Sequence, residues 1–166
     1  MRRLVLSLVL GVAAPAAAQT HDMMQHGADT ARVSVMAVVK SLFDGMRAGD
    51  SAKVRAAFHP QASLATVGTR GGVPTVTFDS LAEFARAVGT PHAEMWDERT
   101  RDEMVHIDGG MAMVWAPYDF HLGTKFSHCG VDNFQLARTP QGWKIIALVD
   151  TRQRVGCPGQ PAPAKP

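Results

Sequence analysis

The sequence predicts one α+β domain, in which helices precede a long antiparallel sheet. Apolar residues recur at helical spacing in three stretches of the first half of the chain. From Trp96 to Trp143 no such stripe occurs, and turns separate four strand-like runs instead. These turns are Asp108-Gly109-Gly110, Leu122-Gly123-Thr124 and Thr139-Pro140-Gln141-Gly142. A length of 166 residues with 46% hydrophobic residues fits a single globular domain.

Each of the three predicted helices has a recognisable end. The first runs from about Asp29 or Thr30 to Ala48-Gly49-Asp50, where glycine ends it. The second begins after Asp50 and stops at His59, because Pro60 disfavours helical geometry before it. The third runs from Ser80 to about Val88 and starts with a capping box formed by Ser80 and Glu83.

Six strands are predicted, and the sheet they form has two apolar faces. The expected ranges are 62–67, 73–78, 95–107, 111–122, 125–138 and 142–152. Within 111–122, Trp115 and Pro117 share one face, whereas Tyr118 and Phe120 share the other. One face packs on the helices. The other is expected to form a homodimer interface, or to lie beneath the terminal segments.

Residues 1–18 have the features of a secretory signal peptide. Arg2 and Arg3 precede an apolar run from Leu4 to Val12, and Ala16-Ala17-Ala18 provides a cleavage signal. The run is well short of the ~20 residues that span a bilayer, so no stable membrane insertion is expected after cleavage. Removing both arginines turns the formal charge of +2 to neutral, and a balanced charge gives no reason to expect a nucleic-acid partner. The protein is therefore predicted to be periplasmic or secreted.

Two segments are expected to flank a folded domain of residues 30–157. Residues 19–29 show no hydrophobic period and predict a flexible leader, and residues 158–166 predict a disordered tail. After cleavage, the N-terminal amine, two amides and the His21 imidazole would form a square-planar set for Cu(II) or Ni(II). Cyclisation of Gln19 would remove the amine, so a solvated leader without metal is the alternative.

Cys129 and Cys157 are the two cysteines of the chain. Export to an oxidising compartment favours a disulfide between them, which would add ~3 to 4 kcal/mol of stability. Two unpaired thiols are the alternative, because a sequence does not show the separation of the Cα atoms.

Several segments resemble the nuclear transport factor 2-like superfamily, which includes ketosteroid isomerase, SnoaL-type cyclases and a bacterial group labelled as lumazine-binding. They are Met46-Arg47-Ala48-Gly49-Asp50, Phe58-His59-Pro60-Gln61-Ala62, Gly142-Trp143-Lys144-Ile145 and the stretch from Trp115 to Phe134. The resemblance implies three N-terminal helices packed on a strongly curved, mostly antiparallel sheet that forms a cone. It implies little about function, because many activities use this fold.

Comparison with ketosteroid isomerase argues against steroid isomerisation. That chemistry needs a carboxylate base, a tyrosine and a protonated aspartic acid. The resemblance places Leu42 at the tyrosine position and Thr66 at the base position, and Asp132 alone matches the oxyanion aspartate. Leucine donates no hydrogen bond, and threonine is too weak a base to remove a carbon-bound proton.

A polar cluster is expected inside the cone if Asp132 points inward. The predicted ligand contacts are Trp115, Asp119, His128, Asp132 and Asp150. His128 and Asp132 could instead act as a general base with an orienting carboxylate. The acids could also form a structural salt-bridge network with Arg152.

Three functions follow from this cluster. The first is binding of a small organic ligand, and the second is a SnoaL-like isomerase, cyclase or hydrolase that uses His128 and Asp132. The third is an interaction or assembly domain whose cavity is filled by its own side chains. No His-x-His, Cys-x-x-Cys or His-Glu-x-x-His spacing occurs, so no metal ion or cofactor is expected in the domain.

Overall fold

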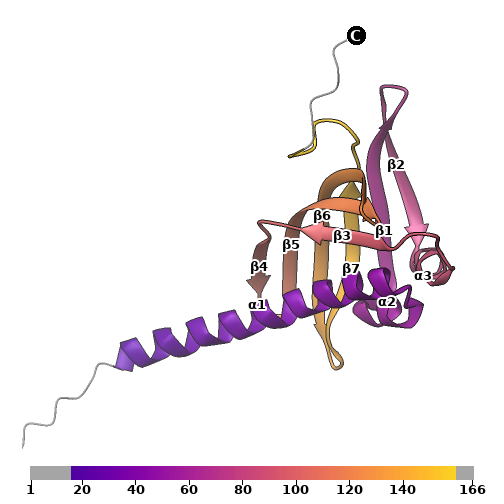
Figure 1. Ribbon diagram of the computed structural model, residues 1–166. Coiled ribbons are helices and arrows are strands. Elements are labelled where there is room, and N and C mark those ends of the chain that lie inside the picture. The colour runs from indigo at the N-terminus through magenta and orange to yellow at the C-terminus, as the bar shows by residue number, and fades with distance from the viewer. Residues whose placement is uncertain (1–15, 160–166) are drawn as a thin grey trace, which may run out of the picture.

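One open sheet of seven strands forms the larger part of the fold (Figure 1). The computed structural model describes residues 16–159, with side chains from residue 27 onward. The strands are β1 (Phe58–Arg70), β2 (Val73–Ser80), β3 (Trp96–Thr100), β4 (Met104–Asp108), β5 (Met111–Leu122), β6 (Lys125–Thr139) and β7 (Gly142–Thr151). Their order is β2-β1-β7-β6-β5-β3, and β4 also pairs with β5. Since β1 and β7 run parallel and the other pairs antiparallel, the predicted α+β class is confirmed, although the sheet does not close.

Two short helices begin where the local sequence predicts, although the first of them ends at Ala57, before the predicted His59, because β1 starts at Phe58. In α2 (Ser51–Ala57), the Asp50 side chain accepts hydrogen bonds from the backbone of Ala52 and Lys53. In α3 (Leu81–Gly89), Ser80 and Glu83 form the expected capping box. Gly49, with a φ of 65°, makes the left-handed turn that ends the preceding helix, a conformation that glycine adopts without steric cost.

The first helix, α1 (Ala16–Ala48), starts well before the predicted Asp29. The predicted leader, residues 19–29, contains no proline, so the helical hydrogen bonding can run through it. The N-terminal half of α1 extends past the edge of the sheet (Figure 1). Residues 1–15 of the predicted signal peptide and residues 160–166 of the predicted tail lie outside the described residues, and cleavage after Ala18 remains a prediction.

The single strand predicted at 95–107 is two strands, because the chain breaks opposite a proline. β3 pairs with one half of β5 and β4 with the other half. Between them lies Pro117 of β5, which has no N–H to continue the ladder; its carbonyl accepts a hydrogen bond from the backbone of Arg101 at 3.0 Å. Asp102 takes a left-handed conformation, with a φ of 49°, at this break.

The hydrophobic core lies between the helices and the inner face of the sheet. The α1 residues Val35, Val39 and Leu42 are at most 1% exposed. Phe43 packs edge-on against Phe134 of β6, with ring centroids 6.0 Å apart. The core fills only one end of the space under the helices, so the other end can form a pocket.

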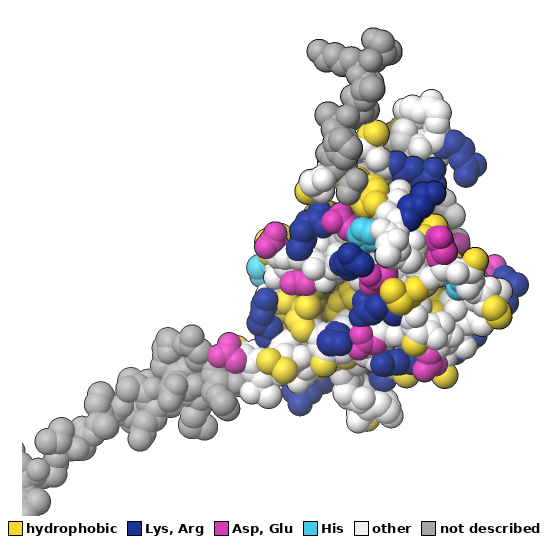
Figure 2. All heavy atoms as spheres, viewed as in Figure 1, with side chains coloured by type: hydrophobic (Ala, Val, Ile, Leu, Met, Phe, Trp, Pro, Cys, Tyr) yellow, Lys and Arg dark blue, Asp and Glu magenta, His cyan; other side chains and the backbone are white. Residues whose placement is uncertain are grey.

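On the face shown in Figure 2, basic and acidic side chains are interspersed over the domain. Neither sign of charge forms a continuous patch there. Among residues 16–159, no helix combines the length and the apolar character needed to cross a membrane.

Candidate functional site

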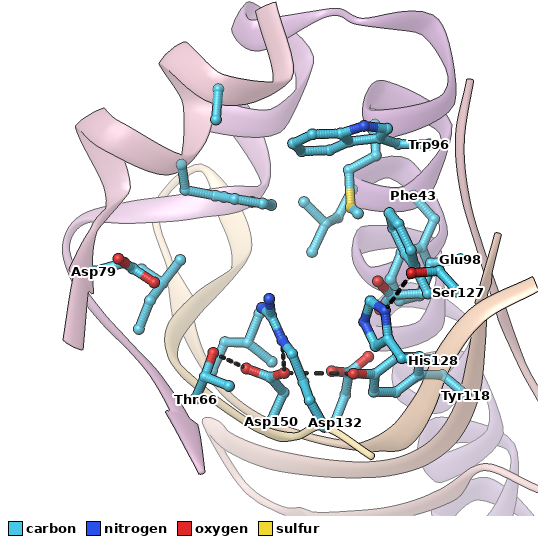
Figure 3. Close-up of a pocket in the computed structure, with 18 of the residues that line it drawn as sticks. Phe43, Thr66, Asp79, Trp96, Glu98, Tyr118, Ser127, His128, Asp132 and Asp150 are labelled. Carbon is cyan, nitrogen blue, oxygen red and sulfur yellow. Dashed lines mark hydrogen bonds and ion pairs between the residues drawn. The ribbon is translucent and has the colours of Figure 1, made fainter. Parts of the chain in front are cut away.

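A pocket of about 520 Å³ lies between the inner face of the sheet and helices α1 and α3 (Figure 3). This volume is in the range of small-molecule sites. Its apolar lining includes Leu42, Phe43, Met46, Leu64, Phe84, Trp96, Phe120, Leu122 and Leu148. Its polar lining includes Thr66, Asp79, Glu83, Arg86, Glu98, Tyr118, Ser127, His128, Asp132, Asp150 and Arg152.

Aromatic rings form one wall of the pocket. Trp96 meets Phe120 edge-on, with ring centroids 6.1 Å apart. The imidazole of His92 stacks on Trp96 at 4.1 Å, and its Nε2 lies 2.9 Å from the carbonyl oxygen of Ala87. The Trp96 ring is thereby supported by the segment that follows α3, so a flat ligand would meet a fixed aromatic surface.

Asp150 is the best-satisfied carboxylate of the pocket. Thr66 donates a hydrogen bond to its Oδ1 at 2.6 Å. Arg152 Nε donates to Oδ2 at 2.6 Å, and the Tyr118 hydroxyl lies 3.4 Å from the same atom. Burial disfavours the charged guanidinium, but its bond to Asp150 prevails and raises the pKa of Arg152. Arg152 and Asp150 both line the pocket, and Figure 3 shows Asp150 between Thr66 and Asp132 on its floor.

Glu98 and Asp132 form a pair of interacting carboxyl groups on the same floor. Burial raises the pKa of Glu98 to about 7. Burial and the neighbouring Glu98 charge raise the pKa of Asp132 well above its usual range. Two adjacent carboxylates cannot both ionise at low cost, so the pair retains one proton at neutral pH. Asp132 is 3% exposed, and its Oδ2 receives no hydrogen bond from any described N–H or hydroxyl group.

His128 is held as a neutral imidazole between aromatic rings. It stacks on Phe120 with ring centroids 4.8 Å apart and meets Tyr118 edge-on at 5.8 Å. Its Nδ1 lies 3.1 Å from the Ser127 hydroxyl. Burial and the positive charge of Arg152 lower the pKa of His128 to about 4. His128 is therefore available as a hydrogen-bonding partner or base, and not as a cation.

The structure brings three of the five predicted contacts together. His128, Asp132 and Asp150 all line the pocket. Their roles stay predictions, and among the described side chains no hydrogen bond joins His128 to Asp132. Leu42 and Thr66, which the resemblance places beside Asp132, line the same pocket.

The predicted inward positions of Trp115 and Asp119 are wrong by one residue of register. The cross-strand partner of Asp132 is Ala116, so the even-numbered residues of β5 face the pocket. Trp115 is 39% exposed on the opposite face. Asp119 forms an ion pair there with Arg101 at 3.1 Å, so it takes no part in the Asp150 network.

Tyr118 and Glu98 are two of the pocket residues that the sequence did not indicate. Tyr118 is the one tyrosine of the chain, and it lies on the face of β5 opposite to the one predicted to point inward. Glu98 comes from an edge strand in which Trp96 and Glu98 alternate with the buried Asp97. Alternation within 96–100 could have paired Glu98 with Trp96, but nothing local shows that Glu98 interacts with Asp132, which lies two strands away in the sheet order.

The predicted disulfide between Cys129 and Cys157 is present, with Cα atoms 5.8 Å apart. Cys129 follows the inward-facing His128, so its side chain lies on the other side of β6. The Cys129 backbone pairs with Gln153 through two hydrogen bonds of 2.9 Å. The disulfide and these hydrogen bonds together fix the segment after β7, which carries Arg152.

The comparisons with known proteins agree with this fold. A family model described as "Putative lumazine-binding" matches residues 30–149. The chain belongs to this family. The match covers α1 from residue 30 onward and the strands that carry Glu98 and Asp132, and it ends just before Asp150 and Arg152. No curated protein matches the sequence.

Several solved structures with a similar fold are described as nuclear transport factor 2-like proteins. One from Novosphingobium aromaticivorans, with a cystatin-like fold, is 13% identical with a TM-score of 0.66, covering 80% of this chain and 88% of that one. One from Shewanella baltica, of unknown function, is 16% identical with a TM-score of 0.56, covering 74% and 94%. A protein from Streptomyces avermitilis, described as a putative dehydratase, is 18% identical with a TM-score of 0.59, covering 76% and 99%. At these identities the likeness concerns the fold.

Proposed function

We propose that this protein binds a small organic molecule in the pocket between the sheet and helices α1 and α3. The observation that carries the proposal is the cavity of about 520 Å³, which combines the supported Trp96 wall with the carboxyl groups of Glu98 and Asp132 on its floor. A pocket of this size, with an apolar lining and a few convergent polar groups, is typical of small-molecule sites. The open cavity favours ligand binding over an assembly domain with a filled interior.

Lumazine is the first ligand to test, because the family description names it. It is a flat bicyclic molecule with ring N–H and carbonyl groups, which suits a pocket with a supported Trp96 wall and carboxyl groups on its floor. Isothermal titration of lumazine, together with a thermal-shift screen of other polar aromatic and isoprenoid-like molecules, measures this directly.

The matched variants for this test are Asp132→Asn and Asp119→Asn. Both remove one carboxylate from the sheet, but Asp119 lies on the opposite face and pairs with Arg101. We expect Asp132→Asn to weaken binding of a hit at least about tenfold, equivalent to 1.4 kcal/mol, and Asp119→Asn to leave it unchanged. If no molecule binds, or if both variants bind equally well, the proposed site is wrong.

A second candidate is an isomerase, cyclase or hydrolase of the SnoaL type. It is favoured by the neutral His128 imidazole, which lines the same pocket as the protonated acid of the Glu98–Asp132 pair. In an isomerisation, His128 would accept a proton from the substrate and the acid pair would return one at another atom, so that protons balance. Incubation of each binding hit with the protein, followed by mass spectrometry and NMR, tests for turnover, which His128→Ala should abolish.

We further propose that the protein is exported. The Cys129–Cys157 disulfide supports this, because such bonds persist in oxidising compartments. Fractionation of the source cells, with mass spectrometry of the mature N-terminus, would show cleavage before Gln19. A full-length chain in the cytoplasm would contradict export.

The outer face of the sheet is proposed as a homodimer interface with a second copy of this chain. One cross-strand row of mainly apolar residues crosses six strands: Phe78, Ala65, Val149, Asn133, Trp115 and Met104. Phe78 is 77% exposed and Met104 52% exposed. Six strands spaced about 4.8 Å apart span roughly 29 Å. Over about seven residues of roughly 3.3 Å each, they give a face of roughly 700 Å², close to the ~800 Å² per partner of a standard interface.

Sedimentation velocity tests this interface. Phe78→Glu combined with Trp115→Glu should convert a dimer to a monomer. Val33→Glu, a change at an apolar α1 residue that is 70% exposed, is the control and should leave the dimer intact. A wild-type monomer at all concentrations would refute the proposal.

A further inference from the structure

The charges around the pocket are unbalanced in a way that restricts the ligand. Five carboxyl groups line the pocket, from Asp79, Glu83, Glu98, Asp132 and Asp150, against the two guanidinium groups of Arg86 and Arg152. The third possible cation, His128, is kept neutral by burial, which lowers its pKa to about 4.

The imbalance is greatest on the floor. Arg152 is already paired with Asp150 at 2.6 Å, so the charge of each is compensated by the other. In the described part of the chain, no Lys, Arg or His side chain forms an ion pair with the carboxyl group of Glu98 or Asp132. Arg47 does reach β3, but it binds the Glu98 carbonyl oxygen and the Asp97 carboxylate on the other side of the strand. The charge of Arg152 still lowers the pKa of both carboxyl groups, but the Glu98–Asp132 pair has no ion-pair partner of its own among the described residues.

We propose that the pocket selects small aromatic cations, molecules with an amidinium, guanidinium or protonated amine on a flat apolar body, over the corresponding anions. This inference rests on the proposed ligand-binding function and adds the charge class of the ligand. The cationic N–H groups would donate to the carboxyl groups of Glu98 and Asp132, and the flat body would lie against Trp96 (Figure 3) and against Phe120, which packs on Trp96 in the same wall.

Three features of the site agree on this class. A planar amidinium offers parallel N–H groups, the geometry that a carboxylate accepts best. The face of Trp96 attracts a cation as well as an apolar ring. An anion would instead lose its hydration and face the Glu98–Asp132 pair, with Arg152 already engaged by Asp150.

The test uses three probes that share one ring system: 2-naphthamidine, 2-naphthamide and 2-naphthoate. Their dissociation constants are measured by isothermal titration at pH 8, above the Glu98 pKa of about 7. We expect the amidine to bind at least about tenfold more tightly than the amide, and the naphthoate to bind more weakly than the amide. Glu98→Gln should reduce the preference for amidine over amide about tenfold, whereas Asp119→Asn should leave it unchanged.

Asp132→Asn is the second variant, and it keeps the test valid if Glu98→Gln does not fold. It preserves the shape of the carboxyl group and should also reduce the preference for the amidine. Circular dichroism establishes folding of each variant before titration.

The outcomes separate this inference from the proposed function. Equal affinities for the three probes would overturn the charge selectivity and leave small-molecule binding intact. A preference for naphthoate that Arg152→Gln removes would assign the polar end of the ligand to Arg152 and overturn the inference. If none of the probes binds at about 1 mM and lumazine does not bind either, both proposals fail.

Discussion

Replacing Gly130 with alanine should destabilise the protein strongly, because β7 approaches β6 most closely at this residue. A Cβ atom at position 130 would lie 1.8 Å from the Thr151 carbonyl oxygen and 2.9 Å from Cε1 of the Tyr118 ring. Carbon and oxygen atoms in close contact are roughly 3.3 Å apart, so the end of β7 would have to move by roughly 1.5 Å.

The cost can be worked out from the bonds that this movement breaks. The Tyr118 hydroxyl donates to the Thr151 carbonyl oxygen, and the Val131 N–H donates to Thr151 Oγ1, both at 3.0 Å. Two hydrogen bonds of about 1 kcal/mol each, with an overpacking strain of about 1–3 kcal/mol, give a loss of about 3–5 kcal/mol. For a domain of this size, that lowers the Tm by roughly 10 °C.

Urea unfolding and differential scanning calorimetry measure both quantities. Gly68→Ala is the matched control, because Gly68 is also in the sheet but its added Cβ would meet nothing closer than Thr75 Oγ1 at 3.9 Å. The control should change the stability by less than about 0.5 kcal/mol. A Gly130→Ala protein as stable as the control would show that β7 does not approach β6 in this way.

Three further changes test the pocket, the disulfide and a helix cap. Because burial raises the pKa of Glu98 from 4.5 to about 7, the folded chain binds more protons than the unfolded chain in this window, and this group's contribution to stability falls as the pH rises. The free energy of unfolding of Glu98→Gln, measured with urea, should therefore rise by about 2–3 kcal/mol relative to that of the wild type between pH 5 and pH 8. A difference between the two proteins that does not change with pH would contradict the raised pKa. The double variant Cys129→Ser, Cys157→Ser should lose about 3–4 kcal/mol of unfolding free energy in non-reducing urea titrations. An unchanged urea midpoint would show that the disulfide contributes little to stability. Ser80→Ala should cost about 1 kcal/mol in the same assay through loss of the capping box, unless the helix start is held by tertiary contacts alone.

The features of the fold that could be predicted from the sequence are those specified within a few residues. Ser80 and Glu83 define the start of α3 because both capping hydrogen bonds are local. The turn at Gly123 is equally local, since its φ of 58° favours glycine. The break between β3 and β4 could not be predicted in this way, because it depends on Pro117, which is near in space but not in sequence.

The candidate site was half predictable for a similar reason. Asp132 and His128 lie on the same face of β6 because side chains alternate along a strand. A correct prediction of which face of β6 points into the pocket therefore places both residues there. The orientation of β5 could not be derived, because Trp115 on one face and Tyr118 on the other are equally plausible core residues. The placement of Glu98 near Asp132 depends on the order of the strands, which is a property of the whole sheet.

The parallel pairing of β1 with β7 also sets the order in which the protein can assemble. β1 joins the rest of the sheet through β7, the last strand of the chain, and Thr66 meets Asp150 across 84 residues of sequence. Contacts between such distant residues cost more loop-closure entropy than local contacts and slow folding. A nascent chain that ends before Gly142 has the β1–β2 hairpin but no strand to receive it. The pocket can therefore be complete only once the C-terminal strand β7 joins the β1–β2 hairpin to the rest of the sheet.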